Sequence, residues 1–314
     1  RRLFQAHSET SSHRFIKQNT QRYELAGRTL GVYGLGNIGK QVAQQASNFG
    51  MEILFFDTRE VAGEVGEAMG WRSVDSPDEL FSQSNAVTLH ISAEDEQGRS
   101  NEHVLGYQQF SLLGSALGKG PKLFINAGRG FLYPPNDLIR AVKDGHIESA
   151  FVDVFPDEPR NALESWRNPY ADTPEIFTTP HIGAATQEAQ PRIARHMALT
   201  TKLRNERGSV RDCVFRPGRA IQAGGSPGDT VLAVVHSDRR GTKKAIDDTI
   251  YEAGASNLGS SHRDFPRYGI AYDVNVLDQP LSHEQLDELV ERAITLTGVE
   301  HPIRSLRQFQ VPKP

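Results

Sequence analysis

A glycine-rich hexapeptide, Gly34-Leu35-Gly36-Asn37-Ile38-Gly39, constrains the fold of this chain more than any other feature. It follows an apolar, β-prone run at 29–34 and opens a segment, 37–49, with helical spacing of Ile38, Val42 and Ala46. Such a turn binds a dinucleotide: the first glycine permits the tight turn, the second the close approach of a pyrophosphate, and the third close helix–strand packing. We therefore expect cofactor contacts from Gly34, Gly36, Asn37, Ile38 and Gly39.

A carboxylate stands where such a fold holds the adenosine ribose. Asp57 directly follows a second predicted strand, 52–56, about 20 residues after Gly36. A carboxylate there accepts hydrogen bonds from the ribose hydroxyls and repels a 2′-phosphate, which favours NAD over NADP. Arg59 is an opposing feature, because a nearby arginine can accept that phosphate.

The rest of the chain alternates between strand-like and helix-like segments. A capping box at Ser76-Pro77-Asp78-Glu79 predicts a helix start. Further strands are predicted at 86–91, 122–125, 149–154 and 176–179, and helices near 136–143 and 187–205. Strand–helix alternation of this kind predicts an α/β fold with a doubly wound parallel Rossmann sheet. Beyond 216–228, which is rich in glycine and proline, a smaller βαββαβ pattern indicates a ferredoxin-like module.

These patterns divide the chain into segments of different kinds. The expected order is a polar connector at 1–25, a dinucleotide-binding domain at 26–180, a return segment at 181–215, a linker at 216–228 and the small module at 229–314. A mitochondrial presequence is the alternative interpretation of 1–25, but Glu9 and Glu24 disfavour it because presequences are poor in acidic residues.

Composition excludes several classes of protein. With 314 residues, 37% hydrophobic and 24% charged, the chain is long and apolar enough for two folded domains. The net charge of −4, without a basic block, argues against nucleic acid as a partner, and no apolar run is long enough to span a membrane. The single cysteine, Cys213, excludes an intramolecular disulfide and fits a reducing, cytoplasmic setting.

Three later motifs carry a family resemblance. They are Asn126-Ala127-Gly128-Arg129-Gly130, Asp153-Val154-Phe155-Pro156-Asp157-Glu158-Pro159 and Thr179-Pro180-His181-Ile182-Gly183. With the glycine loop, they resemble the D-isomer-specific 2-hydroxyacid dehydrogenases over about residues 25–212. The resemblance implies an NAD-dependent oxidoreductase acting on a small 2-hydroxy acid. The sequence after His181 and the small module are similar to the branch that oxidises 3-phosphoglycerate in serine biosynthesis.

Each motif supplies a residue suited to that chemistry. His181 could move the hydroxyl proton, Glu158 could orient its ring, and Arg129 could grip the substrate carboxylate bidentately. Taken singly, the same residues could be a helix cap or core histidine, a loop carboxylate and a surface ion-pair partner. The motifs also place Ala127, Asp153 and Gly183 at the cofactor, together with His90, for which strand-end packing is the alternative. No metal ligand is predicted.

The sequence also departs from the family pattern. Ser92-Ala93-Glu94 replaces a proline usual after the strand at 86–91, and 131–135 replaces an acidic continuation. The family builds its substrate domain mainly from an N-terminal segment, and this sequence supplies only the return at 182–212. We therefore expect the chain to be a truncated form.

Residues 229–308 resemble an ACT domain, a small-molecule sensor. The resemblance implies that His236, Asp238, Gly241 and Asn257 contact an amino acid, serine first, at a subunit interface of a homo-oligomer. Asp238 and Arg240 replace the usual asparagine and proline, so a module used only for assembly is an alternative. For the whole chain, the alternatives are a dehydrogenase of another 2-hydroxy acid and a non-catalytic scaffold that senses NAD(H).

Overall fold

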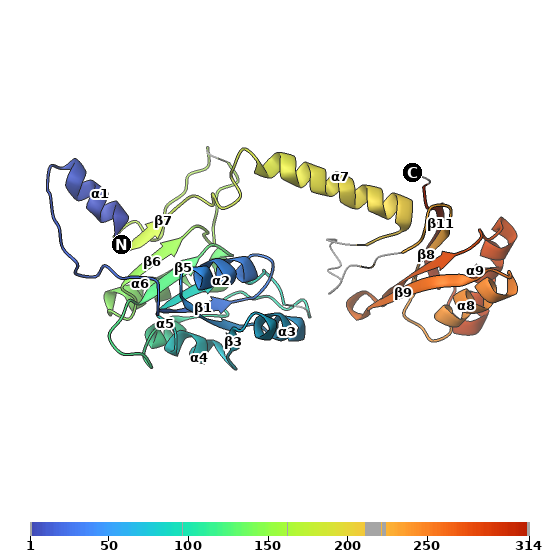
Figure 1. The fold of residues 1–314 in the computed structure, drawn as a ribbon, viewed down its shortest axis with the longest axis horizontal. Helices are drawn as coiled ribbons and strands as arrows, with labels where there is room; N and C mark the ends of the chain where they lie inside the picture. Colours follow the sequence, from blue (N-terminus) through green and yellow to red (C-terminus); the bar gives the residue numbers. More distant parts are fainter. Residues whose placement is uncertain (1, 96, 162, 211–220, 222–223, 313–314) are drawn as a thin grey trace. The chain divides into compact units, whose positions relative to one another are not determined.

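The computed structural model describes residues 2–95, 97–161, 163–210, 221 and 224–312. These residues form two compact units, Arg1–Thr186 and Gln187–Pro314 (Figure 1). Each unit has its own sheet and its own hydrophobic core, and each is described separately. Within the described ranges, no helix is both long and apolar enough to cross a bilayer.

The first unit is built on a parallel seven-stranded sheet in the order β3-β2-β1-β4-β5-β6-β7. The strands are β1 (Thr29–Tyr33), β2 (Glu52–Phe56), β3 (Arg72–Ser73), β4 (Ala86–Leu89), β5 (Leu123–Asn126), β6 (Ser149–Val152) and β7 (Ile176–Thr178). The predicted doubly wound parallel sheet is confirmed, and the predicted strands match to within two residues at each end.

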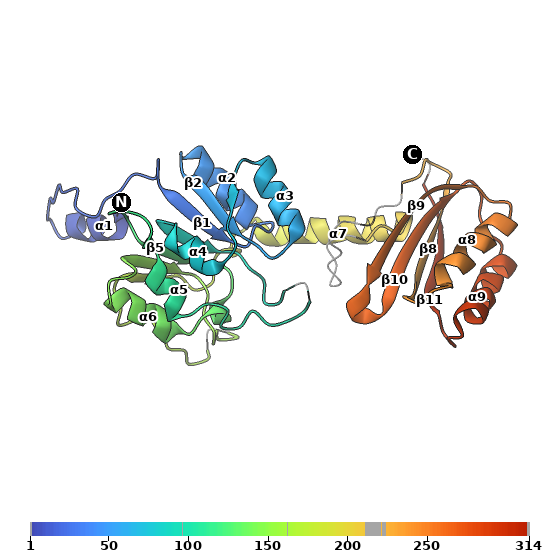
Figure 2. The same cartoon turned by 90° about the horizontal axis from the view of Figure 1, so that it is seen from below.

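Helices cover both faces of this sheet (Figure 2). They are α2 (Gly39–Asn48), α3 (Glu60–Ala68), α4 (Pro77–Ser82), α5 (Tyr107–Leu112) and α6 (Pro135–Lys143), with a 3-10 turn η1 (Gly130–Leu132). A further helix, α1 (Leu3–Ser11), belongs to neither core of the sheet. One core packs α2 and α3 against the sheet, and a larger aromatic core packs α4, α5 and α6 against it. The predicted cap is present, because Ser76 Oγ accepts from Glu79 N–H at 3.1 Å.

Two features of the first unit were not expected from the sequence. Helix α1 lies within the segment expected to be a connector, and Phe4 packs on Phe177 with ring centroids 5.3 Å apart. That contact joins residues far apart in sequence, so no local periodicity announces it. Ile38 is 60% exposed, because α2 starts at Gly39, two residues later than predicted, and turns Gly39, Ala43 and Ala46 towards the core.

The second unit begins with the long helix α7 (Ala189–Arg207) and continues as a βαββαβ module. Its elements are β8 (Thr230–Ser237), α8 (Thr242–Glu252), β9 (Asn257–Phe265), η2 (Pro266–Tyr268), β10 (Ile270–Leu277), α9 (His283–Thr297) and β11 (Ile303–Gln310). The sheet is antiparallel in the order β11-β8-β10-β9, which confirms the ferredoxin-like pattern. The sequence pattern predicts the last strand at 299–306, but β11 starts at Ile303, because α9 runs to Thr297 and ends at Gly298. Most of the linker predicted at 216–228 lies outside the described residues.

The two faces of the smaller sheet carry different cores. Leu232, Val234 and Leu277 face α8 and α9. Val231, Val274 and Val276 face the opposite side, where Ile221 and Val311 cover them. Helix α7 ends against this module: the Tyr272 hydroxyl donates to Gly208 O at 2.5 Å.

Candidate active site

The predicted site residues of the first unit follow the carboxyl ends of its strands. The glycine loop follows β1, Asp57 follows β2, His90 follows β4, the Arg129 loop follows β5, the Asp153–Glu158 segment follows β6, and His181 follows β7. Because the strands are parallel, all of these ends meet at one edge of the sheet. The order of strands reverses between β1 and β4, which is where open α/β sheets form their ligand crevice.

The glycine loop has the three properties that a pyrophosphate site requires. Gly34 has φ +94°, a conformation that side chains disfavour. A Cβ on Gly36 would meet only Arg59 Nη2, at 3.7 Å, so a ligand can approach the backbone there. A Cβ on Gly39 would lie 2.0 Å from Gly34 O, so the start of α2 packs directly on the turn. The loop therefore fits NAD, with the N–H groups of the α2 N-terminus available to its phosphates.

Asp57 is tied to its surroundings before any cofactor binds. Its carboxylate accepts from Leu35 N–H at 2.8 Å, from Arg59 N–H at 2.9 Å, and from the Arg59 guanidinium at 2.9 and 2.6 Å. Burial works to raise the pKa of Asp57, but the Arg59 bonds and charge together with Leu35 N–H leave that pKa below its usual value. The carboxylate is therefore ionised at neutral pH and holds the glycine loop next to it.

Replacing Asp57 by alanine should narrow the difference in affinity between NADH and NADPH. The change removes an acceptor for the ribose and a charge that repels a 2′-phosphate, while Arg59 remains to attract it. Fluorescence titration of both cofactors measures the ratio, with Arg59→Gln as the variant expected to widen it. Wild-type protein that binds NADPH as tightly as NADH would contradict the assignment of Asp57.

His90 lies at the end of β4 beside the glycine loop. Its Nε2 is 3.0 Å from Thr88 Oγ1, and its backbone lies 2.9 Å from where a Cβ on Gly34 would stand. Burial lowers the pKa of His90 to about 4, so its ring is neutral at pH 7. This position fits both strand-end packing of His90 and a contact between His90 and the cofactor.

The buried, neutral state of His90 makes stability depend on pH. An unfolded histidine takes up a proton near pH 6.5 but folded His90 does so only near pH 4, so stability falls as the pH drops through that window. The loss should approach about 3 kcal/mol at pH 4 and be absent in His90→Gln. Urea unfolding followed by tryptophan fluorescence reports this unit alone, because Trp71 and Trp166 both belong to it. Equal pH dependence in the two proteins would show that His90 is not the cause.

His181 and Glu158 meet across two loops. His181 Nδ1 lies 2.7 Å from Glu158 Oε2, while Glu158 Oε1 accepts from Phe155 N–H at 2.9 Å. The His181 side chain is 50% exposed, which sets aside the interpretation of a buried core histidine. With Nδ1 held by the carboxylate, Nε2 is the ring nitrogen that can exchange a proton with a ligand.

Asp153 is held within the protein by three hydrogen bonds. It is buried, and its carboxylate accepts from Thr179 Oγ1 at 2.5 Å, Ile182 N–H at 2.9 Å and Gly183 N–H at 3.0 Å. These bonds brace the turn in which His181 adopts φ +53°. Asp153 and Gly183 therefore act on the position of His181, and a direct contact with the cofactor is not needed to explain them.

Asn126 is a positioning residue that sequence reasoning did not single out. It is fully buried at the end of β5, donates from Nδ2 to Arg129 O at 2.9 Å, and accepts from Gly128 N–H at 3.0 Å. The Arg129 side chain is exposed, with Nη1 donating to Gly128 O at 2.9 Å. A Cβ on Gly130 would lie 2.0 Å from the Phe155 carbonyl carbon, so this loop packs on the loop that carries Glu158.

The residues expected to bind an effector do not converge within one chain. His236 is buried, with Nδ1 on Ser237 O at 2.8 Å and Nε2 on Asp273 at 2.7 Å. Asp238 is exposed, and Gly241, with φ +112°, abuts the end of α9. Asn257 lies at the other end of the sheet, because it pairs with Leu277 whereas His236 pairs with Ala271.

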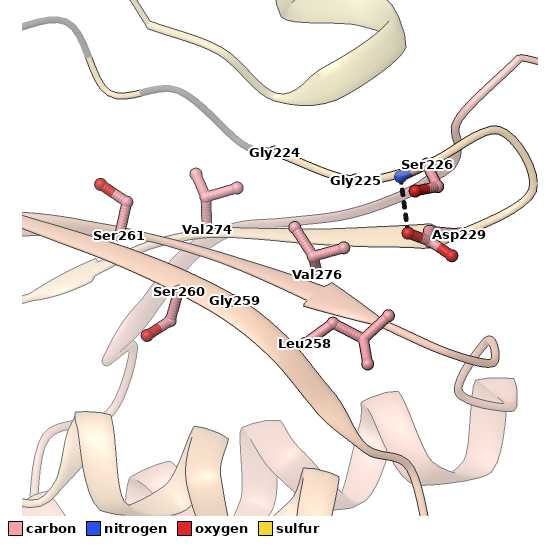
Figure 3. Close-up of a pocket in the computed structure, with 10 residues that line it drawn as sticks. All are labelled: Gly224, Gly225, Ser226, Asp229, Leu258, Gly259, Ser260, Ser261, Val274 and Val276. Carbon is pink, nitrogen blue, oxygen red and sulfur yellow. Dashed lines mark hydrogen bonds between the residues drawn. The ribbon is translucent and has the colours of Figure 1, made fainter.

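A hollow of about 340 Å³ lies on the face of the small sheet that α8 and α9 do not cover (Figure 3). Val274, Val276 and Ser261 point into it, and the turn in which Ser226 N–H donates to Asp229 covers it. The four expected effector residues are not part of its lining.

Comparisons with known proteins give a consistent result. Residues 1–183 match the family described as D-isomer specific 2-hydroxyacid dehydrogenase, NAD binding domain. D-3-phosphoglycerate dehydrogenase 1 of Saccharomyces cerevisiae is 32% identical over 82% of this chain and 54% of its own length. The enzyme of that name from Haemophilus influenzae is 28% identical over 88% and 64%. The chain thus spans about half to two thirds of the length of these relatives.

Solved structures extend the comparison to other members. A glyoxylate reductase from Paecilomyes thermophila aligns with a TM-score of 0.52 and 26% identity, covering 66% of this chain and 58% of that one. A D-lactate dehydrogenase from Aquifex aeolicus, complexed with NAD and lactic acid, aligns with a TM-score of 0.52 and 27% identity, covering 64% and 60%.

Proposed function

This chain belongs to the D-isomer-specific 2-hydroxyacid dehydrogenase family, with the family's NAD-binding domain as its first unit, and we propose that it oxidises D-3-phosphoglycerate to 3-phosphohydroxypyruvate. The observation that carries the proposal is the His181–Glu158 pair, which lies at the same sheet edge as Arg129 and the glycine loop. This edge brings a proton-exchanging group, its orienting carboxylate and a forked cation to the place where the cofactor would bind.

The chemistry assigned to these residues follows from their contacts. NAD bound at the glycine loop would accept the hydride from the hydroxyl-bearing carbon. Arg129 would hold the substrate carboxylate with two parallel N–H bonds. His181 would take the hydroxyl proton at Nε2, and Glu158 at Nδ1 would stabilise the imidazolium that results. In the reverse direction, His181 returns that proton to the carbonyl oxygen.

The choice of 3-phosphoglycerate is supported by the curated relatives, which include several enzymes named for that substrate. The two solved structures described above are named for glyoxylate and lactate, so another small 2-hydroxy acid is the second candidate. A test compares NADH oxidation with 3-phosphohydroxypyruvate, hydroxypyruvate, pyruvate and glyoxylate. Preference for the phosphorylated acid supports the proposal, and preference for an unphosphorylated acid overturns it. NADH binding without turnover of any acid would support the scaffold alternative.

We further propose that the small module is an ACT-like regulatory domain of a homo-oligomer and that serine is its effector. Its βαββαβ topology and the exposed Asp238, next to the Gly241 turn that opens α8, support this. Asn257 begins β9 and pairs with Leu277, at the far end of β10 from that turn, so it cannot share a ligand with the turn in the same chain and would have to contribute to a second copy's site. Isothermal titration of the chain with serine, alongside its oligomer size, tests both parts.

A further inference from the structure

Three polar side chains gather on the helix-covered face of the small sheet. Asp273 on β10 pairs in register with Val234 of β8 on one side and His262 of β9 on the other. His236 lies two residues beyond Val234, so it shares that face. Val234 belongs to the core beneath α8 and α9. The three polar residues therefore lie on the same face of the sheet as this core, on the side towards the edge strand β9.

The potential ligand atoms of these side chains converge. His236 Nε2 lies 2.7 Å from Asp273 Oδ2, and His262 Nδ1 lies 3.1 Å from Asp273 Oδ1. One nitrogen from each histidine and a carboxylate oxygen all lie within 4.8 Å of one another. Tetrahedral zinc with bonds of about 2.0–2.1 Å separates its ligand atoms by roughly 3.3 Å, so small side-chain rotations would admit the ion.

The other nitrogen of each imidazole is already held by an acceptor. His236 Nδ1 lies 2.8 Å from Ser237 O, and His262 Nε2 lies 2.8 Å from Asp264 Oδ1. A ring N–H donated to a carbonyl or carboxylate leaves the opposite nitrogen with its lone pair directed at the cluster. This is the arrangement that orients metal-binding histidines in proteins.

Asp273 supplies an independent indication. Its side chain is 0% exposed, and Oδ1 makes no hydrogen bond although it faces His262 Nδ1 and, at 3.6 Å, Lys243 Nζ. A buried carboxylate oxygen without a hydrogen bond is costly unless a cation compensates it. His262 is 38% exposed, so an ion could enter from the β9 edge and keep a position open to solvent.

We propose that His236, His262 and Asp273 form a binding site for a divalent transition metal of the zinc class. Two imidazoles and one carboxylate suit zinc, nickel or cobalt better than calcium or magnesium, which prefer oxygen ligands alone. The three ligands come from β8, β9 and β10, so a bound ion would clamp the edge strand β9 to the centre of the sheet. This site lies in the second unit and is independent of the proposed dehydrogenase chemistry.

Lys243 is the nearby charged side chain that would compete with a metal ion for Asp273. Lys243 on α8 faces Asp273 but lies closer to Asp247, with Nζ 2.7 Å from Asp247 Oδ1. Its ammonium can turn wholly to Asp247 when an ion arrives, and removing its charge should favour the ion. Without a metal, the histidines and Lys243 must together offset the charge of Asp273.

Isothermal titration of the untagged 314-residue chain with zinc chloride tests the proposal. We expect one ion per chain at micromolar affinity, a rise of the thermal midpoint of the second unit, and a tetrahedral absorption spectrum with cobalt. His262→Asn at the exposed edge and the isosteric Asp273→Asn should each weaken binding at least tenfold, and Lys243→Gln should tighten it. His301→Asn is the matched control, because His301 is an exposed histidine on the same unit, outside the cluster.

Circular dichroism establishes that each variant is folded. Absence of zinc binding to the wild type would overturn the proposal. So would unchanged binding in folded His262→Asn, or loss of binding in Cys213→Ser with retention in His262→Asn, which would place the ion elsewhere.

Discussion

Replacing His181 by alanine should lower turnover by about 10²–10⁴-fold while leaving NADH affinity nearly unchanged. The imidazole is held by Glu158 through Nδ1, so its removal deletes the group that exchanges the substrate proton. The glycine loop and Asp57, which we expect to bind the cofactor, form no hydrogen bond with the His181 ring in the described part of the chain. Turnover is measured by NADH absorbance, in whichever form of the protein converts the substrate fastest. NADH affinity is measured by fluorescence.

His103 provides a control with the same backbone constraint. Both histidines are exposed and adopt positive φ, +53° at His181 and +51° at His103, so alanine introduces similar backbone strain at each. His103→Ala should keep near-wild-type turnover.

Arg129→Lys should lower turnover about as severely as His181→Ala, because a lysine cannot reproduce the bidentate fork. Wild-type rates in His181→Ala would refute the catalytic assignment.

The location of the candidate site could be predicted from the sequence because parallel strands place their carboxyl ends together. Gly34, Asp57 and His181 each directly follow a β-prone run, so their convergence follows from strand–helix alternation alone. What joins the loops could not be predicted in this way. Gly130, in the loop after β5, abuts Phe155, in the loop after β6, through a contact that depends on the spacing of these two strands.

In the second unit, too, part of the structure could be predicted from the sequence and part could not. The apolar stripes of α8 and α9 predict the helix-covered core. The helical spacing of Ala245, Ile246, Thr249 and Ile250 predicts that these residues face inward, and all four are buried. His236 was expected to contact an effector, but its neighbours are set by strand register. Register brings Asp273 and His262 to it and leaves Asn257 at the opposite end of the sheet. A resemblance in loops does not fix register, so the separation of Asn257 from His236 within one chain could not be predicted.

Gly39→Ala should destabilise the first unit by roughly 3 kcal/mol and reduce NADH affinity by tenfold or more. The added Cβ would lie 2.0 Å from Gly34 O and 3.3 Å from Val32 Cγ1. Gly34 cannot retreat, because its own Cα faces the His90 backbone closely enough that a Cβ there would lie 2.9 Å away. The start of α2 must therefore move, and with it the N–H groups offered to the phosphates.

Gly63→Ala is the matched control for this prediction. Gly63 also lies within a helix, α3, but a Cβ there meets nothing within 4 Å. Alanine should raise the free energy of unfolding by about 0.5–1 kcal/mol, because it has the better helix propensity, and leave NADH affinity unchanged. Urea unfolding by tryptophan fluorescence and NADH titration on the same samples compare the two variants. If Gly39→Ala bound NADH like the wild type, contact between α2 and the turn would not be what shapes the phosphate site.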